Sequence, residues 1–215
     1  MNIGIIGSGK MGSALGKIWV EQGHRLLFSH SRDLGKLKAL ADLAGTNAQS
    51  GTPAQAAEFG EVILLAVPYT ALHKVLSEVG SLEDKVVITC VSGLKPDFEG
   101  KTIGLPTQLK TSVAEEIAQL APRAKVVEAF NTTFAEILQS QSREFGTERP
   151  TIFYCGDDES AKAIVAGLIF ECGYEALDMG HLRAARTLES LATAWVQMAT
   201  VSNIFPNVAL KVLRR

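Results

Sequence analysis

The sequence predicts an α/β fold: a doubly wound parallel sheet with a small C-terminal α/β extension that ends in a long helix. Three observations predict it. Short apolar runs alternate with amphipathic helical segments, as in strand–helix–strand units with right-handed crossovers. The run at residues 61–67 is almost continuously apolar, which is typical of a parallel strand buried on both faces. The first strand leads into a glycine-rich turn and then a helix, a common opening of such sheets.

Local patterns place each element along the chain. The expected strands are short apolar runs at residues 2–6, 25–29, 61–67, 85–90, 125–130, 151–155 and 174–177. The expected helices have apolar residues at helical spacing, between Gly12 and Gly23 and at residues 34–43, 69–79, 111–120, 159–172 and 182–202. Residues 140–150 are polar and lack periodicity, so they divide a domain at residues 1–145 from a smaller part at residues 146–215.

The turn after the first strand fits the dinucleotide-binding pattern G-x-G-x-x-G. Its residues are Gly7, Ser8, Gly9, Lys10, Met11 and Gly12. Gly7 permits the tight turn, Gly9 lets the backbone approach a pyrophosphate, and Gly12 lets the helix pack closely on the strand. The helix N-terminus then offers unpaired N–H groups and a positive dipole end to phosphates. The pattern predicts a Rossmann-type dinucleotide-binding domain, and the alternative is an ordinary turn between strand and helix.

The end of the second expected strand indicates which dinucleotide binds. NAD-binding sites usually have an Asp or Glu there, which binds the ribose 2′-hydroxyl. Here the segment carries Ser29, Ser31 and Arg32, then Lys36 one helical turn later, while Asp33 is interpreted as the N-cap of the next helix. Hydroxyls and a guanidinium bind a 2′-phosphate that a carboxylate would repel. We therefore predict NADP(H) rather than NAD(H), and the alternative is that Arg32 and Lys36 are solvated surface charges.

Three further turns are expected beside the cofactor, because ligands of such sheets bind outside the carboxyl ends of the strands. The first is Ala66-Val67-Pro68, which would form the wall on the adenosine side. The other two contain Ser92 and Asn131, which would lie beside the nicotinamide. Each turn is also explained by plain turn formers, and Asn131 is equally suited to cap the helix that follows it.

Composition excludes several classes of partner. The net charge of −2 and the hydrophobic content of 47% give no basis for binding nucleic acid or an anionic membrane. No apolar stretch reaches the roughly 20 residues of a membrane span, and the N-terminal residues form an expected strand rather than a targeting segment. The three cysteines, Cys90, Cys155 and Cys172, lack C-x-x-C spacing and lie in or beside apolar runs, which indicates reduced core thiols and a cytoplasmic location.

Several short segments carry a resemblance to a known family. They are Ser31-Arg32 after the second strand, the run Cys-Gly-Asp-Asp-Glu-Ser at residues 155–160, Gly-His-Leu at residues 180–182 and Leu-Glu-Ser-Leu at residues 188–191. With them, the chain resembles the F420-dependent NADP oxidoreductases over nearly its whole length. The same family includes the soluble reductase domain of six-transmembrane metalloreductases.

The resemblance implies that the two parts of the chain have different roles. The N-terminal part is a Rossmann domain that binds NADP(H), and the C-terminal part covers the nicotinamide. Hydride then passes between NADPH and a small-molecule redox acceptor, a flavin or the deazaflavin F420. The chain departs from archaeal members on the acceptor side, where a His-Thr-Ile-Pro-like turn is replaced by Asn131-Thr132-Thr133-Phe134.

Hydride transfer between two ring cofactors requires orientation and exclusion of water more than a catalytic acid. The sequence has no Cys–His, Ser–His–Asp or paired-carboxylate set. We therefore assign the candidate catalytic residues Asn131 and His181 to positioning roles. Either His181 or Arg186, which flank the start of the last helix, would bind an anionic part or a ring oxygen of the second substrate, and the alternative is that both are ordinary surface residues. No metal site is predicted, because the acids at residues 157–159 open a helix and are interpreted as caps.

Two other functions fit the same pattern. One is an NADPH-dependent dehydrogenase or imine reductase of a small metabolite, although such enzymes use longer C-terminal helical domains than the roughly 65 residues after Pro150. The other is a non-enzymatic NADP(H) sensor. The last helix also carries an apolar stripe from Leu188 through Trp195 to Met198, which should pack on the Rossmann domain, on a second subunit, or on both. A homodimer is expected, because two-fold pairing is the commonest way to cover such a face.

Overall fold

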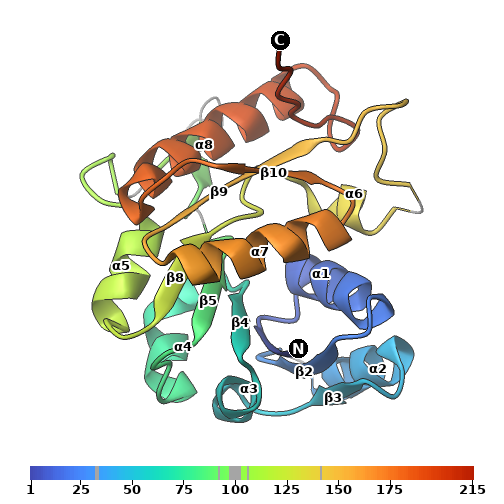
Figure 1. Cartoon of the computed structure of the whole chain (residues 1–215), viewed down its shortest axis with the longest axis vertical. Helices are drawn as coiled ribbons and strands as arrows, with labels where there is room; N and C mark the ends of the chain where they lie inside the picture. Colours follow the sequence, from blue (N-terminus) through green and yellow to red (C-terminus); the bar gives the residue numbers. More distant parts are fainter. Residues whose placement is uncertain (32–33, 92, 97–102, 106, 141) are drawn as a thin grey trace.

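The computed structural model describes residues 1–31, 34–91, 93–96, 103–105, 107–140 and 142–215. Its strands are β1 (Asn2–Ile6), β2 (Arg25–Ser29), β3 (Ala48–Ser50), β4 (Val62–Leu65), β5 (Val86–Thr89), β6 (Lys95–Pro96), β7 (Ile103–Gly104), β8 (Lys125–Glu128), β9 (Thr151–Gly156) and β10 (Glu175–Asp178). Its helices are α1 (Lys10–Glu21), α2 (Leu34–Ala44), α3 (Pro53–Phe59), η1 (Tyr69–Ala71), α4 (Leu72–Val79), α5 (Val113–Leu120), α6 (Ala135–Leu138), α7 (Glu159–Glu171), η2 (Leu182–Ala184) and α8 (Ala185–Val201). The α/β Rossmann-like fold with a long final helix is confirmed (Figure 1).

One eight-stranded sheet forms the centre of the molecule, in the order β10-β9-β8-β5-β4-β1-β2-β3. Neighbouring strands are parallel except β8 and β9, which run antiparallel with Glu128 opposite Cys155. The sheet is therefore mixed rather than wholly parallel. A parallel neighbour needs a crossover that returns the chain to the opposite edge. The described residues between β8 and β9 form one four-residue helix, α6, so the chain re-enters the sheet from the edge at which it left.

Between α2 and β4 the structure has two elements without a counterpart in the predicted pattern, β3 and α3. Strand β3 has three residues and an exposed surface, so it carries no apolar alternation. Helix α3 is only seven residues long, but it begins with a full capping box between Thr52 and Gln55 and has Pro53 in its first turn. That Thr-Pro-x-Gln signature is a helix start that the sequence does contain.

The core lies on both faces of the sheet. One cluster joins α1 and α7, and in it the Trp19 Nε1 donates a hydrogen bond to the Leu168 carbonyl oxygen at 3.2 Å. The other cluster joins α3, α4 and α5. Helix α8 contributes Leu188 to the second cluster and Trp195 to the first, so it passes over an edge of the sheet from one face to the other. Figure 1 shows it along the top of the molecule, above β9 and β10.

Residues after position 145 complete the same sheet and the same core as those before it, since β9 pairs with β8 and α7 packs on α1. The division at residue 145 thus remains a prediction about function rather than a visible break in the sheet. Within the described residues, no helix is both long and apolar enough to cross a membrane.

Candidate functional site

The fingerprint turn connects β1 to α1, and its three glycines have different surroundings. A Cβ atom on Gly7 would lie 2.4 Å from the Ala66 carbonyl oxygen, and φ is +111° there. A Cβ on Gly12 would lie 2.0 Å from the Gly7 carbonyl oxygen. A Cβ on Gly9, by contrast, would have no protein atom within 4 Å. Gly7 and Gly12 are thus required by packing, and the space at Gly9 is what a pyrophosphate needs for a close approach to backbone.

A pocket of about 260 Å³ lies beside this turn. Its lining comes from the turn, the ends of β2 and α2, and the segment after α6: Ser8, Gly9, Lys10, Ser13, Ser31, Leu37, Leu40 and Gln139. A larger pocket of about 490 Å³ continues along the outer side of α1 and shares Ser13, Leu40 and Gln139 with it. The helix N-terminus at Gly9 has no side-chain cap, so its N–H groups remain open to an anion.

Some predicted cofactor contacts use their polar atoms within the protein. Ser29 is fully buried and its hydroxyl donates to the Ile5 carbonyl oxygen at 2.9 Å. Ser8 donates its hydroxyl to the Ser29 carbonyl oxygen at 2.9 Å. The Lys10 ammonium forms an ion pair with Glu136 at 2.8 Å. These side chains shape the turn, and the backbone of the turn is what faces the pocket.

Three residues predicted for the cofactor site fall outside the described part of the structure. Arg32 and Ser92 are not described, and of Lys36 only the backbone within α2 is described. Asp33, interpreted as the N-cap of α2, also lies outside the described residues. The predictions made for these four residues therefore stand as they were.

The carboxyl ends of the central strands lie side by side, as predicted. The register pairs Ile6 with Leu65 and Leu65 with Thr89, so the turns after β1, β4 and β5 occupy one edge. Val67 is buried, whereas Pro68 is exposed and begins the short helix η1. Strand β8 continues this edge, because Thr89 lies opposite Glu128.

Asn131 follows β8 at this edge and is almost fully buried. It does not cap a helix: α6 begins after Phe134, which makes no side-chain cap. The capping alternative is wrong, because the chain makes a turn at residues 131–133 before α6 starts. Instead, the Asn131 Nδ2 donates to the Glu128 Oε1 at 2.5 Å. Burial raises the pKa of Glu128 well above its usual range, and the nearby Glu189 carboxylate adds to the shift.

Glu128 and Glu189 are buried acids that sequence reasoning missed. Both are completely inaccessible to solvent. The Glu189 Oε1 accepts a hydrogen bond from the Val113 backbone N–H at 2.6 Å, so α8 satisfies the N-terminus of α5. Burial raises the pKa of Glu189 to about 8, against the lowering effect of these backbone hydrogen bonds. The signal that could have identified them is an acid within a core segment: Glu128 inside the otherwise apolar run 126–130, and Glu189 between Leu188 and Leu191 on the apolar stripe of the last helix.

Arg186 also joins α8 to α5, through an ion pair with Glu115. Its Nε and Nη2 donate to the two oxygens of Glu115, each at 2.7 Å. The guanidinium holds the pKa of Glu115 below its usual range. The predicted role of Arg186 in binding an anionic substrate must therefore compete with this bidentate ion pair.

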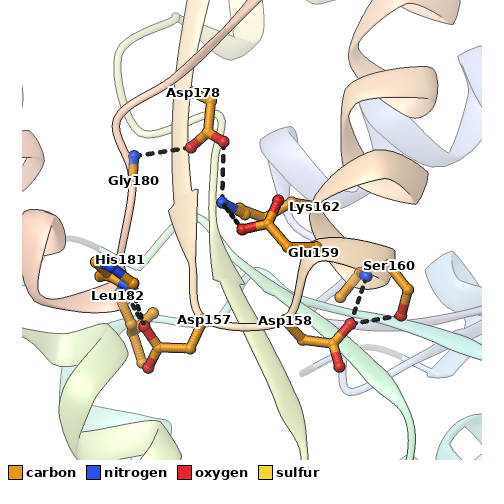
Figure 2. A network of polar contacts seen from close by, with 10 residues as sticks. Asp157, Asp158, Glu159, Ser160, Lys162, Asp178, Gly180, His181 and Leu182 are labelled. Carbon is orange, nitrogen blue, oxygen red and sulfur yellow. Dashed lines mark hydrogen bonds and ion pairs between the residues drawn. The ribbon is translucent and has the colours of Figure 1, made fainter.

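His181 lies away from Asn131 and from the carboxyl ends of the central strands. Its side chain is 90% exposed, and its Nδ1 is 3.5 Å from the Asp157 Oδ1 (Figure 2). Asp157 follows β9, and because β9 is antiparallel to β8 its end lies near Lys125, at the start of β8. The structure therefore groups Asn131 with the glycine turn at the carboxyl edge and places His181 at the opposite end of β8.

The acids at residues 157–159 act as caps and anchors (Figure 2). The Asp158 Oδ1 accepts from the Ala161 N–H at 2.8 Å and so caps α7, which confirms that interpretation for Asp158. The Asp157 Oδ1 accepts from the Leu182 N–H at 2.9 Å, and Glu159 pairs with the buried Lys162, which also reaches Asp178. In the described residues, no three His, Cys, Asp or Glu side chains are grouped as metal ligands.

Comparison with known proteins shows similarity to NADP-dependent oxidoreductases. The family described as NADP oxidoreductase, coenzyme F420-dependent, matches residues 2–93, from β1 to the turn after β5. The metalloreductase STEAP3 of Rattus norvegicus is 29% identical over 189 residues, which cover 88% of this chain. The chain is similar to F420-dependent NADP oxidoreductases. It spans about a third of the length of STEAP3, since the match covers 36% of that protein.

Solved structures extend the similarity to the whole chain at the level of the fold. A candidate F420-dependent NADP reductase from Arthrobacter sp. FB24 has a TM-score of 0.87 at 24% identity, with both chains fully covered. The hypothetical protein SMa0349 of Sinorhizobium meliloti has a TM-score of 0.69 at 27% identity and covers 86% of this chain. An imine reductase of Myxococcus stipitatus, solved with NADP+, has a TM-score of 0.69 at 18% identity; 95% of this chain matches 64% of that one. The predicted resemblance to F420-dependent NADP oxidoreductases is confirmed.

Proposed function

We propose that this chain is an NADP(H)-dependent oxidoreductase that transfers a hydride between the nicotinamide and a flavin-like or deazaflavin (F420-like) acceptor. The observation that carries the proposal is the contrast between the three glycines of the turn. Gly7 and Gly12 are fixed by backbone contacts, while Gly9 faces open space at the uncapped start of α1. That space and those N–H groups suit a dinucleotide pyrophosphate.

The described turn after β1 suits the phosphates of the cofactor, and the other predicted contacts would complete the site along the edge. The backbone of residues 7–12 would hold the pyrophosphate, and Ser31, which lines the adjoining pocket, would lie near the 2′-phosphate with Arg32 and Lys36. Val67 and Pro68 would flank the adenosine side, and Ser92 and Asn131 the nicotinamide. The unpartnered, buried Oδ1 of Asn131 at this edge is a further sign that a ligand donor completes the site.

Bound NADPH would supply the hydride, and the acceptor ring would take it. The protein would therefore orient the two rings and exclude water from them. Helix α8 passes over the sheet edge and is held to α5 by the Arg186–Glu115 ion pair and the Glu189–Val113 hydrogen bond. A helix fixed in this way excludes water from the region above β5 and β8. The acceptor would enter between α8 and the turns of the carboxyl edge.

The imine reductase alternative rests on similarity of fold. This chain covers 62–64% of the imine reductases and reductive aminases from Streptomyces aurantiacus, Aspergillus terreus and Myxococcus stipitatus. At 18–20% identity these likenesses show the fold alone and carry no argument for their substrates.

A turnover assay tests the proposal. Purified protein is mixed with NADPH and, in separate reactions, F420, FMN, FAD, a ferric chelate, a cyclic imine and a keto acid, and the loss of reduced nicotinamide is followed. Oxidation with a flavin or with F420 is the expected result. Oxidation only with the imine or keto acid would contradict the acceptor class, and tight binding without any turnover would instead support a sensor. The Gly9→Ala variant serves as the inactive control, and Gly167→Ala in α7, where a Cβ meets no atom within 4 Å, is the matched active control.

A further inference from the structure

The pair formed by Asn131 and Glu128 is the most unusual polar contact of the described structure. Both side chains are more than nine-tenths buried. The Asn131 Nδ2 donates to the Glu128 Oε1 at 2.5 Å, while the Asn131 Oδ1 and the Glu128 Oε2 have no partner among the described residues. Buried polar atoms in proteins are normally paired, and each exception calls for an explanation.

The contact fixes the orientation of the Asn131 carboxamide. An amide side chain has a donor face and an acceptor face, which a half-turn about χ2 exchanges. With the proton of the neutral Glu128 carboxyl on Oε2, Oε1 is a carbonyl oxygen that accepts a hydrogen bond, so it selects the amino group of Asn131 as its partner. The Asn131 carbonyl oxygen is then left as an unsatisfied acceptor.

The location of that acceptor indicates the group that would satisfy it. Glu128 is the last residue of β8 and lies opposite Thr89, the last residue of β5. This is the part of the carboxyl edge at which the nicotinamide is proposed to lie. The nicotinamide ring carries a carboxamide whose amino group offers two N–H donors, the complement of an unpaired carbonyl oxygen.

Resting on the proposed NADP(H) function, we propose that Glu128 is a positioning residue that orients Asn131 so that its Oδ1 accepts a hydrogen bond from the nicotinamide carboxamide. Glu189, the other buried acid nearby, uses its Oε1 to accept from the Val113 N–H, and its Oε2 has no hydrogen-bond partner among the described residues. The two acids thus have separate roles. Glu128 orients the side chain of Asn131, and Glu189 joins α8 to the N-terminus of α5.

A pair of cofactors tests this contact without any knowledge of the acceptor. NADP+ has the carboxamide, and its 3-acetylpyridine analogue has a methyl ketone in the same place, so the analogue lacks the N–H donors. Dissociation constants of both are measured by calorimetry for each variant. We expect the wild type to prefer NADP+ by about threefold to tenfold, the range of one neutral hydrogen bond.

Variants then assign the preference to the two residues. Asn131→Ala removes the acceptor, and Glu128→Met removes the group that orients it. In both variants the ratio of the dissociation constant of the analogue to that of NADP+ should fall to near one. Glu128→Gln keeps a carbonyl oxygen at the same place and should retain most of the preference. Glu189→Gln is the matched control, because it also removes a buried carboxyl but should leave the ratio unchanged.

A measurement on the wild type covers the case in which Glu128→Met does not fold. The side-chain amide signal of Asn131, assigned by its loss in Asn131→Ala, should exchange slowly with solvent both before and after NADP+ is added, since Nδ2 keeps facing Glu128. Rapid exchange of these protons in the complex would overturn the inference, as would a preference that survives Asn131→Ala or is absent from the wild type. Failure of the wild type to bind either cofactor would overturn the proposed function itself.

Discussion

Gly12 lies directly against Gly7: a Cβ atom on Gly12 would be 2.0 Å from the Gly7 carbonyl oxygen. Helix α1 therefore starts in contact with the turn that precedes it. Gly9, between these two residues, has no protein atom within 4 Å of its Cβ position. Three glycines of one motif thus divide into two that the fold requires and one that it does not.

This division predicts separate effects for two alanine variants. Gly12→Ala should destabilise the fold by several kcal/mol, because backbone must shift at the start of α1, as with overpacked cores where about 1–3 kcal/mol or more is lost. Gly9→Ala should leave the free energy of unfolding nearly unchanged while NADP+ binding is lost, because the methyl group takes the space of the pyrophosphate. Urea unfolding and calorimetry check both, with Gly167→Ala as the neutral control. Normal NADP+ affinity in Gly9→Ala would make the motif a structural turn only.

Cofactor choice is predicted from a residue outside the described structure. Arg32→Ala should weaken NADPH binding by about 1.5–3 kcal/mol, the value of a hydrogen bond to a charged group, and should hardly change NADH binding. Calorimetric titration with each cofactor measures both. Equal losses for the two cofactors, or none, would exclude Arg32 as the ligand of the 2′-phosphate.

The Arg186–Glu115 ion pair should be important for stability. Its two hydrogen bonds of 2.7 Å join α8 to α5, and both side chains are largely shielded from solvent. Arg186→Ala should lower the free energy of unfolding more than the control variant does, because two charge-assisted hydrogen bonds between α8 and α5 are lost. The exposed Arg183, one turn earlier, supplies the control, and Arg183→Ala should change stability by less than about 0.5 kcal/mol. A similar loss in both variants would show that the ion pair contributes nothing specific.

The raised pKa of the buried Glu189 should make the stability of the fold depend on pH. Burial raises its pKa in the folded protein to about 8, from an ordinary value of 4.5. The folded state therefore holds a proton that the unfolded state has released between these limits. The stabilisation is complete below about pH 4.5 and is lost as the pH rises to about 8, at no more than about 1.4 kcal/mol per pH unit for this one proton. Glu189→Gln should reduce this slope, and an identical slope in wild type and variant would contradict the assignment.

The expected homodimer would use only the C-terminal end of the apolar stripe that the sequence suggested, together with apolar residues beyond it. Trp195 is 2% exposed and stacks on Phe134 with ring centroids 5.6 Å apart, so this part of the stripe is covered within the chain. The exposed apolar residues nearby are Met198, Val201 and Phe205. Light scattering should give twice the chain mass of 23.0 kDa, and Val201→Glu should halve it with the fold retained. A wild-type mass of one chain would rule out the dimer.

Much of the fold was predictable because strands buried on both faces are continuously apolar and the glycine turn has a fixed geometry. Strand β9 illustrates the limit, since residues 140–150 carry no signal for the direction in which the chain re-enters the sheet. Asn131 was predicted as a site residue, but its partner Glu128 was not, because a single acid in an apolar run does not reveal what it contacts. His181 was placed by resemblance, and only the antiparallel β8–β9 pairing shows that it lies at the far end of β8.

The most direct test of the NADP(H) site is a calorimetric titration of the wild-type protein with NADPH and with NADH under identical conditions. We predict one site per chain and binding of NADPH at least about tenfold tighter than that of NADH, a difference of about 1.4 kcal/mol for the 2′-phosphate. Equal affinities, or no binding of NADPH at all, would contradict an NADP(H) site at the carboxyl edge of this sheet.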